Sequence, residues 1–185
     1  FKEKAQEIAR DLISWTDNGT LPVVVDAASC THGLLAEVPT ALDGDLKQQF
    51  AAVRILDTIE WLDQEVMDYL PLTQPVQRVA VHPNCSVEHM GLTETMVSIL
   101  DKVANQVVVP EGATCCGTAG DRGLLHPELV ESATREQARS LEGVEFDAYV
   151  SDNRTCEMGL EMTLDLPYES IATVLERASR PVVSP

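Results

Sequence analysis

Residues 106–117 read QVVVPEGATCCG: three valines, a proline, and then two adjacent cysteines flanked by glycines. Continuous apolar runs of this length are typical of parallel strands that are buried on both faces. In open parallel α/β sheets, ligands bind outside the carboxyl ends of the strands, which is where this cysteine pair would lie. The stretch therefore predicts an α/β fold with a functional site just beyond a strand.

Three other short apolar segments resemble the valine run, and helical patterns separate them. Strands are expected at residues 22–26, 78–82, 106–110 and 147–151. Apolar side chains recur every three or four residues elsewhere, which predicts helices. These helices are expected at residues 2–15, 47–70, 90–103, 127–141 and 169–179, with a loop at 71–75. The alternation predicts a single α/β domain, built on a parallel sheet that is internal and has helices on both faces.

Composition excludes several classes of function. The chain has 185 residues, with 13 Lys and Arg against 30 Asp and Glu and a net charge of -17. Nucleic acids and anionic membranes are bound through Lys and Arg, so neither is expected as a partner. No apolar run approaches the roughly 18 to 20 residues of a membrane span, and the first residues do not resemble a signal peptide. We expect a cytoplasmic protein, or one placed peripherally at the inner face of the membrane.

The five cysteines all follow predicted strands. They are Cys30, Cys85, Cys115, Cys116 and Cys156. An odd number of widely spaced cysteines fits metal binding or redox chemistry better than a disulfide framework. Because the carboxyl ends of parallel strands meet at one edge of a sheet, the thiols are expected to converge there.

Two segments share one pattern. Residues 26–34 and 152–160 both read Asp-x-x-(Ser or Thr)-Cys-x-x-Gly-Leu after an apolar strand. We interpret residues 1–45 as the tail of a truncated first repeat and residues 76–185 as a complete second repeat, within one fragment that spans 1–185. Cys30 would then be an orphan ligand of a second site.

The second repeat supplies four candidate metal ligands, Cys85, Cys115, Cys116 and Cys156. Zinc sites usually bring ligands in Cys-x2-Cys pairs, whereas adjacent cysteines direct their sulfurs to neighbouring points that a cluster of several irons can accept. Gly117 and Gly120 would let the backbone approach such a cofactor. The spacing thus favours an iron-sulfur cluster, and a structural zinc site in a docking module stays open.

Other chemistry stays open as well. His82, His89 and His126 flank these segments, so a mixed cysteine and histidine site can be drawn. Cys115 or Cys116 could instead be the nucleophile of an enzyme or part of a thiol-disulfide centre, with His126 as base. A phosphate-binding loop at residues 117–120 is disfavoured, because the Lys-Ser/Thr of such loops is missing.

Cys85, Cys115-Cys116-Gly117 and Cys156 together resemble the cysteine-rich CCG domain. That domain is found in one of the subunits of heterodisulfide reductase and in iron-sulfur subunits of glycolate, glycerol-3-phosphate and lactate oxidation systems. Residues 82–86, 113–123 and 151–159 are most similar to the C-terminal part of fused flavin and iron-sulfur D-lactate dehydrogenases. The family's fuller motif ends in Cys-x-x-Cys, whereas Gly159 stands at the last position here and Gly33 in the first copy. The motif therefore supplies four cysteine ligands rather than five.

The resemblance implies an electron-transfer role in a flavin-dependent oxidoreductase that acts on a 2-hydroxy acid of the D-lactate or glycolate type. Electrons would pass from an upstream FAD domain, through ferredoxin-like clusters and an iron-sulfur cluster in this chain, of which 4Fe-4S is the expected type, to a quinone or cytochrome. The chemistry on the organic substrate would belong to the flavin domain. The isolated chain is expected to have no catalytic activity of its own, and it need not retain the cluster.

Overall fold

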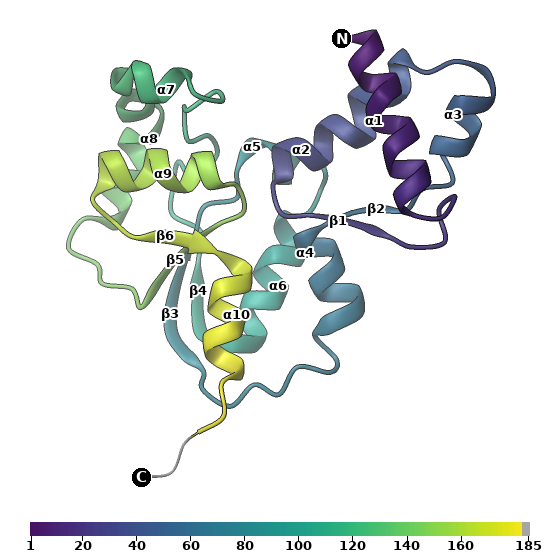
Figure 1. Ribbon diagram of the computed structural model, residues 1–185. Coiled ribbons are helices and arrows are strands. Elements are labelled where there is room, and N and C mark those ends of the chain that lie inside the picture. Colours follow the sequence, from purple (N-terminus) through teal and green to yellow (C-terminus); the bar gives the residue numbers. More distant parts are fainter. Residues whose placement is uncertain (183–185) are drawn as a thin grey trace.

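The structure is a computed structural model, and it describes residues 1–182. Helices and short parallel strands follow one another along the chain (Figure 1). The helices are α1 (Lys2–Trp15), α2 (Ala28–His32), α3 (Gly44–Phe50), α4 (Thr58–Trp61), α5 (Cys85–His89), α6 (Thr93–Val103), α7 (Arg122–Leu125), α8 (Pro127–Leu141), α9 (Arg154–Leu164) and α10 (Ile171–Ser179). The strands are β1 (Val23–Val25), β2 (Ile55–Asp57), β3 (Val76–Val81), β4 (Ala104–Val108), β5 (Ala148–Ser151) and β6 (Tyr168–Ser170). Wider or tighter helical turns follow α2 at Gly33–Glu37 and Val38–Ala41, and α4 at Leu62–Val66.

The strands form two parallel sheets. One has the order β4-β3-β5-β6, and the other pairs β1 with β2. In the larger sheet Val79 is opposite both Val107 and Ala148, and in the smaller one Val24 is opposite Leu56. The expected α/β class with parallel strands and flanking helices is confirmed.

Each face of the larger sheet has its own apolar cluster, because successive side chains of a strand point to opposite faces. Val79 and Val81 pack with α6 and α10, together with the apolar side chains of α4. Ala80 and Tyr149 point the other way and pack against Leu141 of α8 and Leu160 of α9. A third cluster joins α1 and α3 to the smaller sheet. The two helix layers and the smaller sheet are visible in Figure 1.

The prediction of one long helix over residues 47–70 was wrong. That segment holds the end of α3, then strand β2, then α4 and the wider turn that follows it (Figure 1). Ile55, Leu56 and Asp57 pair with β1, and all three side chains are buried. Their apolar spacing also fits a helical period, so pairing with a distant strand decided the outcome.

Two strands predicted to be internal lie at sheet edges. β1 and β4 each pair on one side only within residues 1–182. Val24 is 42% exposed, and Val109, just after β4, is 44% exposed. The strands buried on both faces are β3 and β5. Cys85 follows β3, and Cys156 follows β5. Two helices also begin later than predicted, α6 because Gly91 adopts a φ of +72° and α10 because β6 occupies residues 168–170.

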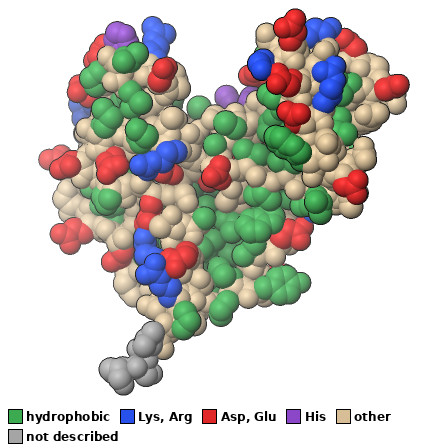
Figure 2. Space-filling view, viewed as in Figure 1, with side chains coloured by type: hydrophobic (Ala, Val, Ile, Leu, Met, Phe, Trp, Pro, Cys, Tyr) green, Lys and Arg blue, Asp and Glu red, His purple; other side chains and the backbone are tan. Residues whose placement is uncertain are grey.

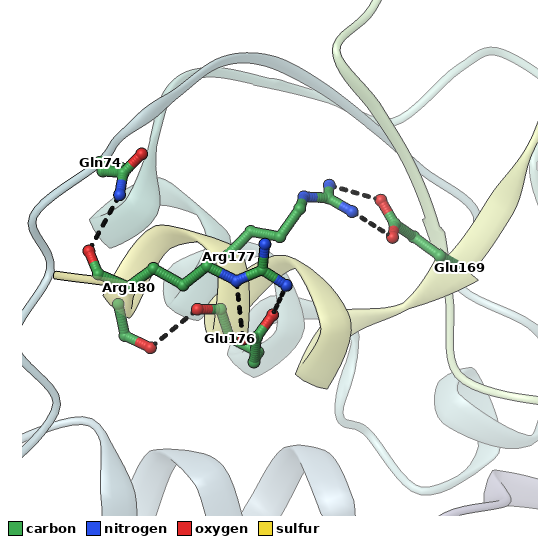
Figure 3. A network of polar contacts seen from close by, with 6 residues as sticks. Gln74, Glu169, Glu176, Arg177 and Arg180 are labelled. Carbon is green, nitrogen blue, oxygen red and sulfur yellow. Dashed lines mark hydrogen bonds and ion pairs between the residues drawn. The ribbon is translucent and has the colours of Figure 1, made fainter. Parts of the chain in front are cut away.

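Polar contacts fix α10 and the edge strand β6 (Figure 3). Arg177 donates two hydrogen bonds to Glu169, one of 2.6 Å from its Nη2. Arg180 pairs with Glu176 at 2.8 Å, and Gln74 donates to the Arg180 carbonyl at 3.0 Å. The Gln74 contact attaches the predicted loop at residues 71–75 to the C-terminal end of α10.

The molecule has a notch between two lobes, one containing α1 and α3 and the other containing α7 to α9 (Figures 1 and 2). Acidic side chains are scattered over both lobes (Figure 2), as expected from the net charge of -17. None of the helices within residues 1–182 is long and apolar enough to cross a bilayer.

Candidate metal centre

Four cysteines from three separate loops line one pocket of about 390 Å³. Cys85 follows β3, Cys115 and Cys116 follow β4, and Cys156 follows β5. Gly117 and Gly120 line the same pocket, as predicted for residues that let the backbone come close. Cys116 and Cys156 are buried, whereas Cys85 and Cys115 are exposed. The thiols therefore span the pocket from its floor to its opening.

Asparagine caps position two of the four thiols. The Oδ1 atom of Asn84 accepts hydrogen bonds from the backbone of Ser86 and Val87, so that α5 begins at Cys85 itself. Asn153 likewise accepts from the Thr155 amide and starts α9, which places Cys156 in the first turn. Capping satisfies amides that the first turn leaves without partners. Each thiol is thus held where a helix meets the end of a strand.

The loop with the cysteine pair is held tightly against α8. Gly117 has a φ of +75°, and a Cβ atom there would lie 2.8 Å from the Leu129 carbonyl oxygen. Only glycine combines this backbone conformation with such a close approach. The Gly117 amide donates to the Cys115 sulfur at 3.4 Å. The turn therefore directs Cys115 outward and Cys116 into the pocket.

The two buried thiols interact directly. The Cys116 and Cys156 sulfurs share a hydrogen bond of 2.7 Å. This hydrogen bond, with a smaller contribution from Thr118, lowers the pKa of Cys116 to about 6 and raises the pKa of Cys156. Burial, and next the charge of Cys115, raise the pKa of Cys85. The floor of the pocket thus holds one thiolate beside one thiol.

This sulfur pair must separate if both thiols bind metal. Two thiolates on one tetrahedral ion, each about 2.3 Å from it, lie about 3.8 Å apart. The observed 2.7 Å is shorter, so at least one side chain rotates on loading. Within residues 1–182, no three His, Cys, Asp or Glu side chains surround a common point as the ligands of one ion would.

Cys30 does not line the pocket, although its neighbour Ser29 does. Cys30 lies on α2 and is exposed. Asn153 donates to the Ser29 hydroxyl at 2.7 Å, and the Ala28 amide donates to the Asp152 carbonyl at 3.2 Å. The two segments with the shared pattern therefore adjoin one another.

The histidines lie outside the pocket lining. His82 is fully buried, its Nδ1 lies 2.7 Å from Gln137 Oε1, and burial lowers its pKa to about 4. His89 lies near His32, with ring centroids 5.6 Å apart. His126, the possible base for a cysteine nucleophile, lies 3.2 Å from Glu128 instead. The structure brings the four thiols together and places these imidazoles elsewhere.

A buried carboxyl pair lies at the junction of the two segments. Burial, and next the Asp57 carboxylate, raise the pKa of Asp152 to about 9. Asp57 already accepts from the Thr31 hydroxyl and the Ile59 amide. Asp152 therefore keeps its proton at neutral pH.

Sequence reasoning missed Thr118 and the two capping asparagines. An asparagine just before a helical pattern is a recognised N-cap signal, so the caps could have been found. Thr118 is 2% exposed, and its Oγ1 lies 2.9 Å from the Cys116 sulfur. A threonine two residues after a cysteine in a loop does not by itself predict this contact.

Comparison with known proteins agrees with the expected resemblance. Residues 79–161 match the model of the CCG cysteine-rich domain. The chain is 27% identical over 160 residues to a subunit of the anaerobic glycerol-3-phosphate dehydrogenase of Escherichia coli strain K12, and the match covers 85% of this chain and 40% of that protein. It thus spans about two fifths of that relative's length.

Two other relatives have different names. Lactate utilization protein A of Oceanobacillus iheyensis is 23% identical over 167 residues, covering 86% of this chain and 68% of that protein. The glycolate oxidase iron-sulfur subunit of Escherichia coli strain K12 is 26% identical over 122 residues, covering 65% and 30%. The matched segment contains Cys85, Cys115, Cys116 and Cys156. Residues 79–161 of this chain are therefore similar to the cysteine-rich domain of the CCG family.

Proposed function

We propose that this chain is an iron-sulfur electron-transfer part of a dehydrogenase. Cys85, Cys115, Cys116 and Cys156 would hold the cluster. The observation that carries the proposal is that these four thiols, from three separate loops, line one pocket. One relative is named as an iron-sulfur subunit, and another as a dehydrogenase subunit.

The donor set fits such a cluster. Soft thiolate ligands select zinc, Cu(I) and iron-sulfur centres among protein metals. Cys116 already favours the thiolate form, and Cys156 gives up its proton on loading. Gly117 and Gly120 leave room for the backbone to approach a bulky group. When bound, the cluster would supply one-electron transfer, and the protein residues would hold it and set its potential.

The finer proposal concerns the rest of the protein. A 4Fe-4S cluster here would accept electrons that an FAD domain removes from a 2-hydroxy acid of the D-lactate or glycolate type and that ferredoxin-like domains pass on. A quinone or cytochrome would be the acceptor. The similarity of residues 82–86, 113–123 and 151–159 to D-lactate dehydrogenases supports this assignment, as do relatives named for lactate and glycolate.

We also propose that residues 1–45 end a first repeat and that residues 76–185 form a second. The support is a shared order of elements. β1 and α2 are followed by β2 and α4, just as β5 and α9 are followed by β6 and α10. Both strand pairs are parallel.

Anaerobic reconstitution followed by iron, sulfide and zinc analysis tests the proposal. About four iron and four sulfide per chain are expected, with a visible absorption band, and Cys116→Ser should lose them. One zinc and no iron would favour a structural docking module instead. A folded chain that binds neither metal would contradict both metal assignments.

A thiol-disulfide function is the second candidate, and the Cys116–Cys156 contact favours it. A low-pKa thiolate beside a second thiol is the arrangement that disulfide exchange uses. Cys85→Ser separates the candidates. It should abolish metal uptake if the thiols hold a metal, and leave the reactivity of Cys116 unchanged if they do not.

A further inference from the structure

Gly159 lies directly beneath Thr118. A Cβ atom at Gly159 would lie 2.4 Å from the Thr118 Cγ2 atom, closer than real side chains approach. Gly33, the corresponding glycine of the first segment, would have no atom within 4 Å of its Cβ. The absence of a side chain at residue 159 is therefore required by Thr118, whereas at residue 33 it is not required by packing.

Thr118 cannot withdraw from this position. It is 2% exposed, and its carbonyl accepts a 2.7 Å hydrogen bond from the Gly123 amide. A Cβ atom at Gly123 would lie 2.6 Å from the Thr118 Cα atom, so the loop closes on the threonine from that side. Thr118 is thus held between its own loop and α9.

The two branches of the Thr118 side chain have different contacts. The methyl group fills the groove over Gly159, and Oγ1 lies 2.9 Å from the Cys116 sulfur. A sulfur bound to a metal is a thiolate and can only accept, so in the loaded centre the threonine hydroxyl would donate this hydrogen bond. Both branches are attached to Cβ, so the χ1 angle that places the methyl group also places the hydroxyl.

We propose that Thr118 is a positioning residue of the thiol centre. It orients Cys116 by a hydrogen bond, and it occupies the space that a fifth ligand side chain at residue 159 would need. Residue 159 is three positions after Cys156 on α9, so a side chain there would lie on the same helix face. The proposal rests on the metal-binding function above. A hydrogen bond to a ligating sulfur stabilises its negative charge, and hydrogen bonds of this kind tune the potential of a cluster.

The packing half of the proposal is tested on the metal-free chain by urea denaturation. Gly159→Ala should lower the midpoint of unfolding strongly, while the control Gly33→Ala should leave it unchanged or raise it. Thr118→Ser, which lacks Cγ2, should restore most of the loss in the double variant with Gly159→Ala. Equal effects of the two alanine variants, or no rescue by serine, would overturn the closure of residue 159.

The hydrogen-bond half is tested on the reconstituted chain by redox titration. Thr118→Val keeps the shape and removes the hydroxyl, whereas Thr118→Ser keeps the hydroxyl. We expect both to retain the iron and sulfide of the wild type, and only the valine variant to shift to a more negative midpoint potential. An unshifted valine variant would overturn the positioning role. A wild-type chain that takes up no iron would overturn the metal-binding function itself, and with it this role, whatever the urea result.

Discussion

Residues 26–34 and 152–160 have the same sequence pattern and different surroundings. In both, a strand ends just before the aspartate and a helix begins two residues after it. Cys156 is 5% exposed and contacts Cys116, whereas Cys30 is exposed. The pattern therefore builds the turn that presents a cysteine, while the loop of residues 115–120 builds the surroundings that bury it.

The largest expected difference between the segments is in metal content. Cys156→Ser should abolish iron and sulfide uptake, because it removes one of four proposed ligands. Cys30→Ser should leave uptake unchanged, since Cys30 lies outside the pocket lining. Metal analysis after anaerobic reconstitution compares the two. Equal losses would mean that both segments serve one centre.

The aspartates that open the segments should differ in their effect on pH dependence. The folded pKa of Asp152, about 9, is above the unfolded value of about 3.9. Between these values the folded chain keeps a proton that the unfolded chain has lost, so the free energy of unfolding falls as pH rises. One proton corresponds to a slope of at most about 1.4 kcal/mol per pH unit.

Asp152→Asn should flatten that slope in urea titrations of the metal-free chain, because the amide has no proton to lose. The control Asp26→Asn, at the exposed equivalent position, should keep most of it. Glu157 is also buried with a raised pKa, so a residual slope of the same sign should persist in Asp152→Asn. A slope that Asp152→Asn leaves intact would assign the retained proton to another residue.

Helix capping should respond in opposite directions in the two segments. Asn153 caps α9, whereas Ala27, its equivalent before α2, makes no side-chain cap. Asn153→Ala should therefore lower the free energy of unfolding by about 1–2 kcal/mol. Ala27→Asn should raise it by a few tenths to about 1 kcal/mol. Chemical denaturation of the metal-free chain measures both, and an unaffected Asn153→Ala variant would mean that its cap contributes no stability.

The last expected effect is a coupling across the contact between the segments. Ser29→Ala removes the acceptor of the 2.7 Å hydrogen bond from Asn153 and should cost about 0.5–1.5 kcal/mol. In an Asn153→Ala background the same change should cost almost nothing, since its partner is already gone. A full, additive cost in the double variant would show that Ser29 acts through other contacts.

Local signals were sufficient for much of the fold. Strong periodicity placed α1 and α8 at the observed bounds, and the apolar runs located β1, β3, β4 and β5 within two residues. β2 and β6 were missed because both overlap stretches whose apolar spacing fits a helix, and each is defined by pairing with a distant strand. Edge positions of β1 and β4 depend on the order of strands, which apolar content does not encode.

The candidate site was predictable where it depends on chain order. The rule that sites follow the carboxyl ends of parallel strands brought Cys85, Cys115, Cys116 and Cys156 together. The raised pKa of Asp152 beside Asp57 and the packing of Thr118 on Gly159 could not be predicted in this way. Both depend on side chains from distant segments that meet only in the folded chain.

The hydrogen bond between Asn153 and Ser29 joins residues 124 positions apart. At about 5–20 residues per second, a ribosome needs roughly 6–25 s to synthesise that interval. α1, β1 and β2 can pair early, but their junction with the second segment must wait for α9. Contacts this distant in sequence slow folding, because a long loop closes before they form. The N-terminal lobe is therefore assembled in two stages during synthesis, first on its own and then against a domain made many seconds later.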